Sequence, residues 1–130
     1  MQTYKTVLIV DDDPITRQLL EAFAQGIGAQ HVMQAGNGAE AMGLLNQHGG
    51  TIDLIFCDLE MPEMDGIELL SFLRAHTFAG AIAIVSGAHR SVVDSASKLA
   101  SLHGLNLLGR VSKPPTKAAL DQLIGSHGHD

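Results

Sequence analysis

The sequence predicts an α/β domain of the (βα)5 type, a doubly wound sheet of five parallel strands with helices on both faces. Short apolar runs alternate along the chain with longer stretches in which apolar residues recur every three or four positions. The runs near residues 53 and 81 are apolar throughout, as expected of strands that helices cover on both sides. Because crossovers between parallel strands are right-handed, this alternation folds into one sheet between two helical layers.

The predicted strands are the five short apolar runs. They are TVLIV (6–10), HVMQA (31–35), DLIFC (53–57), AIAIVS (81–86) and LLGRV (107–111).

The predicted helices carry recognisable starts and stops. Asp13 is a suitable N-cap, and Pro14 a suitable first residue, for a helix that ends near Gly26. Asn37 and Thr116 are expected to cap the second and fifth helices in the same way. The second helix is expected to end near residue 48, and the third and fourth to cover 66–75 and 91–103.

Apolar stripes on the first and fourth helices are expected to face the core because their spacing matches a helical period. The stripes are Ile15, Leu19, Leu20, Phe23 and Ile27 on the first helix, and Val92, Ala96, Leu99 and Ala100 on the fourth.

The length and composition indicate one globular domain. With 130 residues, we expect a single domain over residues 1–126 and a flexible tail at 127–130. The apolar share of 45% and the charged share of 17% are typical of a folded protein. No apolar run approaches the roughly 20 residues that a membrane span needs, so no membrane association is expected. The net charge of −6 disfavours direct binding to nucleic acid.

The single cysteine, Cys57, excludes an internal disulfide and fits a reducing compartment. Its place in an apolar run predicts a buried, unreactive side chain. The N-terminus has no secretory cleavage pattern. We therefore expect a cytoplasmic protein.

Polar residues follow the predicted strands at the edge where parallel sheets bind their ligands. Asp11 and Asp12 follow the first strand, and Asp58 follows the third. Ser86 ends the fourth strand, and Lys113 comes just after the fifth. Three carboxylates in a small volume repel one another unless a cation compensates. Oxygen ligands of this kind suit a hard divalent ion, and we expect Mg²⁺ as the cofactor.

Such a site is arranged to receive a phosphoryl group. Asp58 would be the nucleophile and form an aspartyl phosphate. The Lys113 ammonium, together with Mg²⁺, would neutralise charge on the phosphoryl oxygens, and Ser86 would donate its hydroxyl to one of them. We expect Asp13 to cap the helix that follows and to take no part in the phosphoryl chemistry.

The ordered motifs IVDDDP, FCDLEMPEMDG, IVSGA and VSKPP strongly resemble the receiver domain of two-component response regulators, over about residues 5 to 125. This resemblance implies a flavodoxin/CheY-like sheet with strand order 2-1-3-4-5. It also implies phosphotransfer from a sensor histidine kinase or phosphotransfer protein, with phosphorylation switching an output domain or partner. A receiver is a regulatory module rather than an enzyme, apart from self-catalysed phosphotransfer and slow autodephosphorylation, and receivers also form homodimers.

The resemblance assigns metal ligands position by position. Asp11 and Asp12 match the acidic pair that holds Mg²⁺, with Asp12 binding directly and Asp11 through water. Asp58 matches the phosphoacceptor and also binds the metal, and the backbone carbonyl of Glu60 matches the remaining protein ligand.

Other matching positions surround the phosphoacceptor. Ser86 matches the family's serine or threonine, and Lys113 matches its lysine. Pro114 stands where the family often has a cis peptide bond. Pro62, Asp65 and Gly66 match the family's loop after the phosphoacceptor strand.

One position departs from the family. The residue at its switch position, which turns inward on phosphorylation, is usually a tyrosine or phenylalanine, and here it is Arg110. A guanidinium does not bury as an aromatic ring does, so the output face is expected to be read in another way.

A second resemblance concerns the output. The run KLASLHGLNLLGRVSKPPTKAALDQLI is similar to receivers that precede an EAL-type cyclic-di-GMP phosphodiesterase domain. The chain would then be a fragment of a longer regulator, with that activity outside these residues.

Two alternatives remain at this point. A receiver fold can act as an adaptor that docks a partner without phosphorylation, and Arg110 keeps that hypothesis open. A haloacid-dehalogenase-like phosphatase also uses an aspartyl nucleophile, Mg²⁺, a hydroxyl and a lysine. That family has D-x-D-x-T after its first strand, whereas this chain has DDDP, and this disfavours the phosphatase.

Overall fold

The fold, seen in a computed structural model that describes residues 4–61 and 66–128, alternates strands and helices from end to end. The strands are β1 (Thr6–Val10), β2 (His31–Ala35), β3 (Leu54–Cys57), β4 (Ala81–Ser86) and β5 (Asn106–Ser112). The helices are α1 (Pro14–Gly26), α2 (Gly38–His48), α3 (Gly66–Ala75), α4 (Arg90–Leu102) and α5 (Lys117–Gly128).

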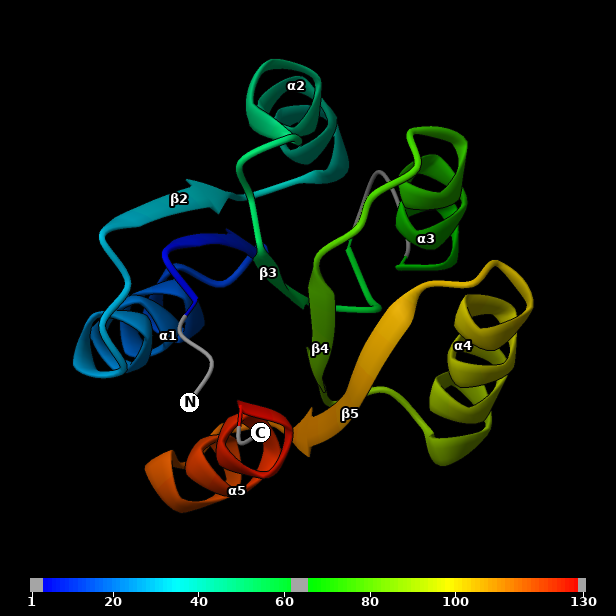
Figure 1. Ribbon diagram of the computed structural model, residues 1–130. Coiled ribbons are helices and arrows are strands. Elements are labelled where there is room, and N and C mark those ends of the chain that lie inside the picture. Colours follow the sequence, from blue (N-terminus) through cyan, green and yellow to red (C-terminus); the bar gives the residue numbers. More distant parts are fainter. Residues whose placement is uncertain (1–3, 62–65, 129–130) are drawn as a thin grey trace.

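The five strands form one parallel sheet in the order β2-β1-β3-β4-β5, which confirms the predicted (βα)5 fold and strand order. Helices α1 and α5 cover one face of the sheet, and α2, α3 and α4 cover the other (Figure 1). The carboxyl ends of the strands therefore meet along one edge, where the helical layers leave room for a site. Within the described residues, no helix is long and apolar enough to cross a membrane.

Two apolar clusters, one on each face of the sheet, hold the layers together. Every residue of β1, β3 and β4 is buried, because these central strands are covered on both sides. Alternate side chains enter opposite clusters, with Leu8 and Ile55 on the α2–α4 side and Val7 and Phe56 on the α1–α5 side. Phe56 meets Phe23 of α1 edge-on, with ring centroids 6.2 Å apart.

The predicted helix starts are confirmed. Asp13 caps α1 through bonds from the Ile15 N–H and the Thr16 hydroxyl, and Asn37 caps α2 by accepting from the Glu40 N–H. At the start of α5, the Ala119 N–H donates to the hydroxyl of Thr116. This last helix continues to residue 128, two positions past the expected domain boundary at 126.

The predicted inward stripes were wrong at three positions. Ile15 is 67% exposed and Leu19 48% exposed, because α1 rests on the sheet through Leu20 and Phe23, which lie on its other flank. On α4, the buried face starts at Val93 and includes Ala96 and Ala100, so Val92 lies beside that face and is 40% exposed.

Strand β5 carries a bulge that the sequence did not predict. Ile82 of β4 pairs with Leu107, but the next residue, Ala83, pairs with Gly109, so Leu108 is an extra residue in β5. Gly109 has φ of +146°, and a Cβ there would lie 2.8 Å from a methyl carbon of Leu123. The backbone conformation therefore favours glycine at this position, and a larger residue would also require the Leu123 side chain to move.

Three helices end with the same pair of backbone hydrogen bonds, a Schellman motif with one residue in the left-handed conformation. In α4, the Gly104 N–H donates to the Ser101 carbonyl and the Leu105 N–H to the Ala100 carbonyl, with φ of +70° at Gly104. Helix α1 ends likewise at Gly28.

At the end of α3 the left-handed residue is a threonine. Thr77, with φ of +50°, donates to the Arg74 carbonyl, and Phe78 donates to the Leu73 carbonyl. A β-branched residue in this conformation is strained by about 1–2 kcal/mol. The motif persists because the apolar side chain of Phe78 packs on the core.

Thr77→Gly is therefore expected to stabilise the protein by about 1 kcal/mol, because glycine adopts positive φ without steric strain. Gly104→Ala is the matched opposite change and should destabilise by a similar amount. Urea unfolding at equilibrium measures both, and a destabilised Thr77→Gly variant would contradict the assignment of strain.

Candidate functional site

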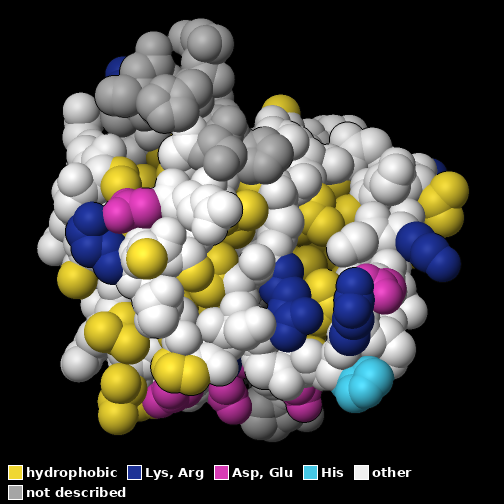
Figure 2. Space-filling model, turned by 90° about the horizontal axis from the view of Figure 1, so that it is seen from below, with side chains coloured by type: hydrophobic (Ala, Val, Ile, Leu, Met, Phe, Trp, Pro, Cys, Tyr) yellow, Lys and Arg dark blue, Asp and Glu magenta, His cyan; other side chains and the backbone are white. Residues whose placement is uncertain are grey.

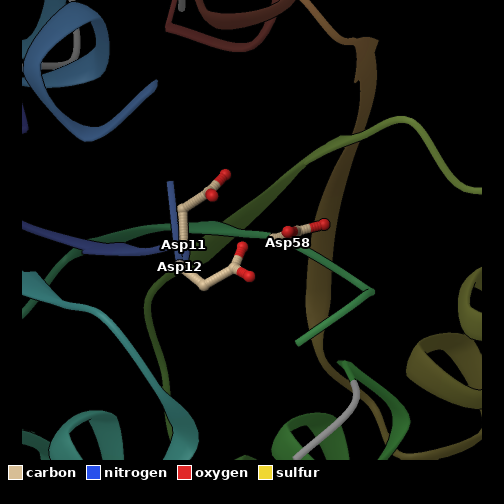
Figure 3. A group of neighbouring side chains, drawn as sticks. All are labelled: Asp11, Asp12 and Asp58. Carbon is tan, nitrogen blue, oxygen red and sulfur yellow. The ribbon is translucent and has the colours of Figure 1, made fainter. Parts of the chain in front are cut away.

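The acidic residues that follow β1 and β3 come together at the carboxyl edge of the sheet. One carboxylate oxygen from each of Asp11, Asp12 and Asp58 lies within 4.8 Å of the others. Figure 3 shows Asp11 and Asp12 leaving the end of β1, and Asp58 leaving the end of the neighbouring strand β3. Asp11 and Asp58 are buried, whereas Asp12 is exposed. The fold thus joins acids that are 46 and 47 positions apart in sequence.

Lys113 closes this cluster from the end of β5. Its Nζ lies 2.8 Å from Asp11 Oδ2 and 3.1 Å from Asp58 Oδ2. Burial lowers the pKa of the Lys113 ammonium, but the adjacent Asp11 and Asp58 carboxylates outweigh burial, and the pKa is raised overall. Lys113 is therefore a permanent positive charge between two buried carboxylates.

The Asp11 carboxylate is buried at an electrostatic cost. Burial, the largest cause, and the nearby charge of Asp58 raise its pKa in spite of Lys113 and of a hydrogen bond from the Asp13 N–H. Among the described atoms, Oδ2 of Asp11 is a buried oxygen that accepts no well-aligned hydrogen bond and has only the ion pair with Lys113. A buried oxygen in this state, beside two further carboxylates, fits a hard divalent cation such as Mg²⁺.

Local turns aim the polar side chains at three strand ends. In each turn the side chain accepts a hydrogen bond from the N–H two residues later. The bonds run from Asp13 N to Asp11 Oδ1 (2.9 Å), from Glu60 N to Asp58 Oδ1 (3.1 Å) and from Ala88 N to Ser86 Oγ (3.0 Å). The side chains are therefore held by their own backbone before any ligand is present.

Asp58 sits at the centre of the site. Its N–H donates to the Val10 carbonyl at 3.0 Å, which continues the pairing of β3 with β1 past the last strand residue. The two carboxylate oxygens accept from the Glu60 N–H and from Lys113. Cys57 beside it is fully buried, and burial raises the pKa of its thiol to about 12, so the thiol stays protonated.

The other predicted site residues lie around this cluster. Ser86 is buried at the end of β4, and the Lys113–Pro114 peptide bond is cis. Arg110 is exposed on β5. Glu60 is exposed in the loop that follows β3, and Pro62 and Asp65 lie outside the described residues.

Sequence reasoning missed Arg17. Its Nη1 donates to the backbone carbonyl of Asp11 at 2.7 Å and its Nε to Gln34 Oε1 at 3.0 Å. The one available signal was its place in the first turns of the helix that starts directly after the acidic run, which does not specify where its side chain points.

Comparison with known proteins gives the family. Residues 7–124 match the response regulator receiver domain. The chain belongs to this family.

Curated relatives of this receiver domain differ in length. It is 38% identical to the two-component response regulator ARR22 of Arabidopsis thaliana, over 95% of this chain and 83% of ARR22. It is 31% identical to the cyclic di-GMP phosphodiesterase RocR of Pseudomonas aeruginosa, over 83% of this chain but only 27% of RocR.

Solved structures show the same fold. A response regulator from Colwellia psychrerythraea superposes on this receiver domain with a TM-score of 0.78 at 32% identity, over 97% of this chain and 98% of that one. A chain of the CheX–CheY–BeF3–Mg²⁺ complex from Borrelia burgdorferi gives a TM-score of 0.82 at 26% identity, over 97% and 90% of the two chains.

The raised pKa of Asp11 gives a stability prediction. Because its folded-state pKa is above its value in the unfolded chain, the folded protein binds this proton more readily, and stability from this group rises as the pH falls from neutral. Asp11→Asn, which cannot ionise, is therefore expected to be more stable than the wild type at pH 7 without divalent cations. The difference should shrink as the pH falls through the raised pKa of Asp11.

Urea unfolding in a chelator at several pH values measures this difference. Asp94→Asn, which replaces an exposed acid on α4, is the matched control and should change stability by less than about 0.5 kcal/mol. An Asp11→Asn protein that is less stable than the wild type at pH 7 would show that Lys113 overcompensates the buried charge.

Proposed function

We propose that this receiver domain is a phosphoacceptor module that takes a phosphoryl group onto Asp58 and switches an output. The observation that supports this most directly is the placement of Asp58. Its carboxylate lies between the Lys113 ammonium and the Glu60 N–H, at the edge where Asp11 and Asp12 also end. A nucleophile surrounded by positive and polar donors, with acids for a metal beside it, is suited to phosphoryl transfer.

In the proposed reaction, a carboxylate oxygen of Asp58 attacks the phosphorus of a phosphohistidine. The new P–O bond forms as the P–N bond breaks, and the departing imidazole takes up a proton from solvent. Lys113 pairs with one phosphoryl oxygen and Ser86 donates its hydroxyl to another. Mg²⁺, held by Asp11, Asp12, Asp58 and the Glu60 carbonyl, would offset negative charge on the transferred group.

The module is proposed to be regulatory rather than an enzyme, with self-catalysed phosphotransfer and slow autodephosphorylation as its own chemistry. A phosphatase of the haloacid dehalogenase type would have its nucleophile after the first strand. Here the acid between the lysine and a backbone N–H is Asp58, after β3. The described geometry therefore favours the receiver over the phosphatase.

The phosphodonor is proposed to be a sensor histidine kinase or a phosphotransfer protein in the cytoplasm. An apolar groove of about 280 Å³ runs between α1 and α5, with Leu19, Phe23, Ile27 and Leu120 in its walls. Ile15, 67% exposed, lies four residues before Leu19 on α1, near the start of the helix that follows the acidic loop. A partner seated here would bring its phosphohistidine to Asp58.

The output is proposed to be read from the face formed by α4, β5 and α5. Figure 2 looks onto the side where α5 lies and shows hydrophobic side chains between Lys, Arg and acidic side chains. On α4, Val92 is 40% exposed and Leu102 83% exposed. A second copy of the chain, or an output domain such as a cyclic di-GMP phosphodiesterase domain, would fit such a mixed surface.

Arg110 supports an alternative in which the domain docks a partner without needing phosphorylation. The side chain at this switch position is exposed on the edge strand β5. No inward aromatic rotation is available to couple Ser86 to the output face. In this alternative the intact acidic site would be a remnant with no effect on the partner.

Phosphorylation is tested with acetyl phosphate and Mg²⁺. Intact-protein mass spectrometry is expected to show one added phosphoryl group in the wild type, none in Asp58→Ala, and an unchanged yield in Cys57→Ala, the adjacent control. Chelation of divalent cations should reduce labelling by at least about tenfold. Labelling that persists in Asp58→Ala would refute the assignment of the phosphoacceptor.

The switch is tested by adding beryllofluoride, which mimics the phosphoryl group, and recording amide chemical shifts. A phosphorylation switch is expected to move amides of Ala88 and Arg110, because a Ser86 hydroxyl drawn to the bound group would change the hydrogen bond that it accepts from the Ala88 N–H. An adaptor is expected to show changes confined to the site, since a ligand that does not distinguish two states shifts neither. Shifts at Asp11 and Glu60 confirm that the mimic has bound in both cases.

A further inference from the structure

We propose that Arg17 is a positioning residue for the acidic pair, a role that rests on the proposed metal and phosphoryl site. The carbonyl that Arg17 binds belongs to the peptide that joins Asp11 to Asp12. The bond from Nη1 to this oxygen is 2.7 Å long, in the range of charge-assisted hydrogen bonds. Arg17 therefore fixes the plane of the peptide from which both acids project.

The guanidinium is itself held in orientation by β2. Its Nε donates to Gln34 Oε1, and Gln34 Nε2 donates at 2.7 Å to Glu21 Oε1 on the next turn of α1. The Glu21 bond settles which end of the Gln34 amide faces Arg17. Because a guanidinium is planar, two bonds on different nitrogens leave it little rotational freedom.

In the loop after β1, Asp11 is restrained at its N–H, at its carbonyl and at one side-chain oxygen. The Asp11 N–H donates to the Ala35 carbonyl at 3.1 Å, its side-chain Oδ1 accepts from Asp13 N, and its carbonyl accepts from Arg17. Asp12 has no comparable side-chain anchor among the described contacts, and is exposed. The direction of the Asp12 carboxylate therefore depends on the peptide that Arg17 holds.

The bonds that Arg17 makes leave the carboxylates available. Its two described hydrogen bonds go to a backbone carbonyl and to an amide oxygen rather than to the acids themselves. The effect of Arg17 on the orientation of the acids can therefore be distinguished from the effect of its charge on Mg²⁺ binding. A cation near an acidic site weakens the binding of a second cation, so loss of the Arg17 charge alone would strengthen Mg²⁺ binding. Loss of positioning would weaken it.

The test is Mg²⁺ titration followed by amide chemical shifts of Asp13 and Glu60, without any phosphodonor. Arg17→Ala is expected to bind Mg²⁺ about tenfold more weakly, as is usual when a residue that orients a metal ligand is removed. Gln34→Ala, which changes no charge, should weaken binding by a smaller factor, and Arg17→Lys should fall between Arg17→Ala and the wild type. Arg74→Ala removes an equal charge at an exposed position on α3 and is expected to bind as the wild type does.

Thermal unfolding in a chelator is measured on the same variants. A role in stability alone would lower the melting temperature of Arg17→Ala and leave its Mg²⁺ affinity unchanged, and this result overturns the proposal, as does tighter binding. If Arg17→Ala does not fold, Gln34→Ala and Arg17→Lys decide the question by the same criterion. A wild type that binds no Mg²⁺ would instead overturn the proposed function on which this role depends.

Discussion

The structure depends on one electrostatic constraint, the confinement of two buried carboxylates and one exposed carboxylate at the edge of a sheet. Asp11 and Asp58 are each about 97% or more removed from solvent, and a single ammonium, that of Lys113, lies between them. Burial, and after it the nearby charge of Asp58, raises the pKa of Asp11 in spite of Lys113. A parallel sheet makes this arrangement achievable, because three separate strands deliver their last residues to the same place.

Backbone N–H groups orient the polar side chains at three strand ends of the candidate site. At β1, β3 and β4 the polar residue at the strand end accepts from the N–H two positions later, and Arg17 adds a bond to the backbone of the acidic loop. Such turns are formed within a few residues of chain, so they survive changes elsewhere. In Asp11 and Asp58 the turn takes one carboxylate oxygen and Lys113 faces the other, so a cation bound here would share these oxygens with Lys113.

Much of the fold and most of the candidate site could be predicted from the sequence. Strands buried on both faces are continuous apolar runs, caps such as Asp13 and Asn37 have a local chemical signature, and residues just after parallel strands must meet. The predictions of which helix residues face the core were less accurate, because helical spacing defines an apolar face but not the angle at which the helix lies on the sheet. Leu19 and Val92 fell on the flank of that face. Arg17 was missed because its target is a backbone carbonyl, which leaves no pattern in the sequence.

The bulge in β5 acts as a spacer for the lysine. One extra residue, Leu108, lets Leu108 and Val111 enter the same apolar cluster although an odd number of positions separates them. If the same sequence paired with β4 without a bulge, the residues after Leu107 would slip by one position, about 3.3 Å along the strand, and their side chains would change face. Lys113 would then no longer point at Asp11. The bulge therefore lets β5 bury Leu108 and Val111 in the core and still bring Lys113 to Asp11. Gly109 makes the bulge possible because it adopts a positive φ without strain.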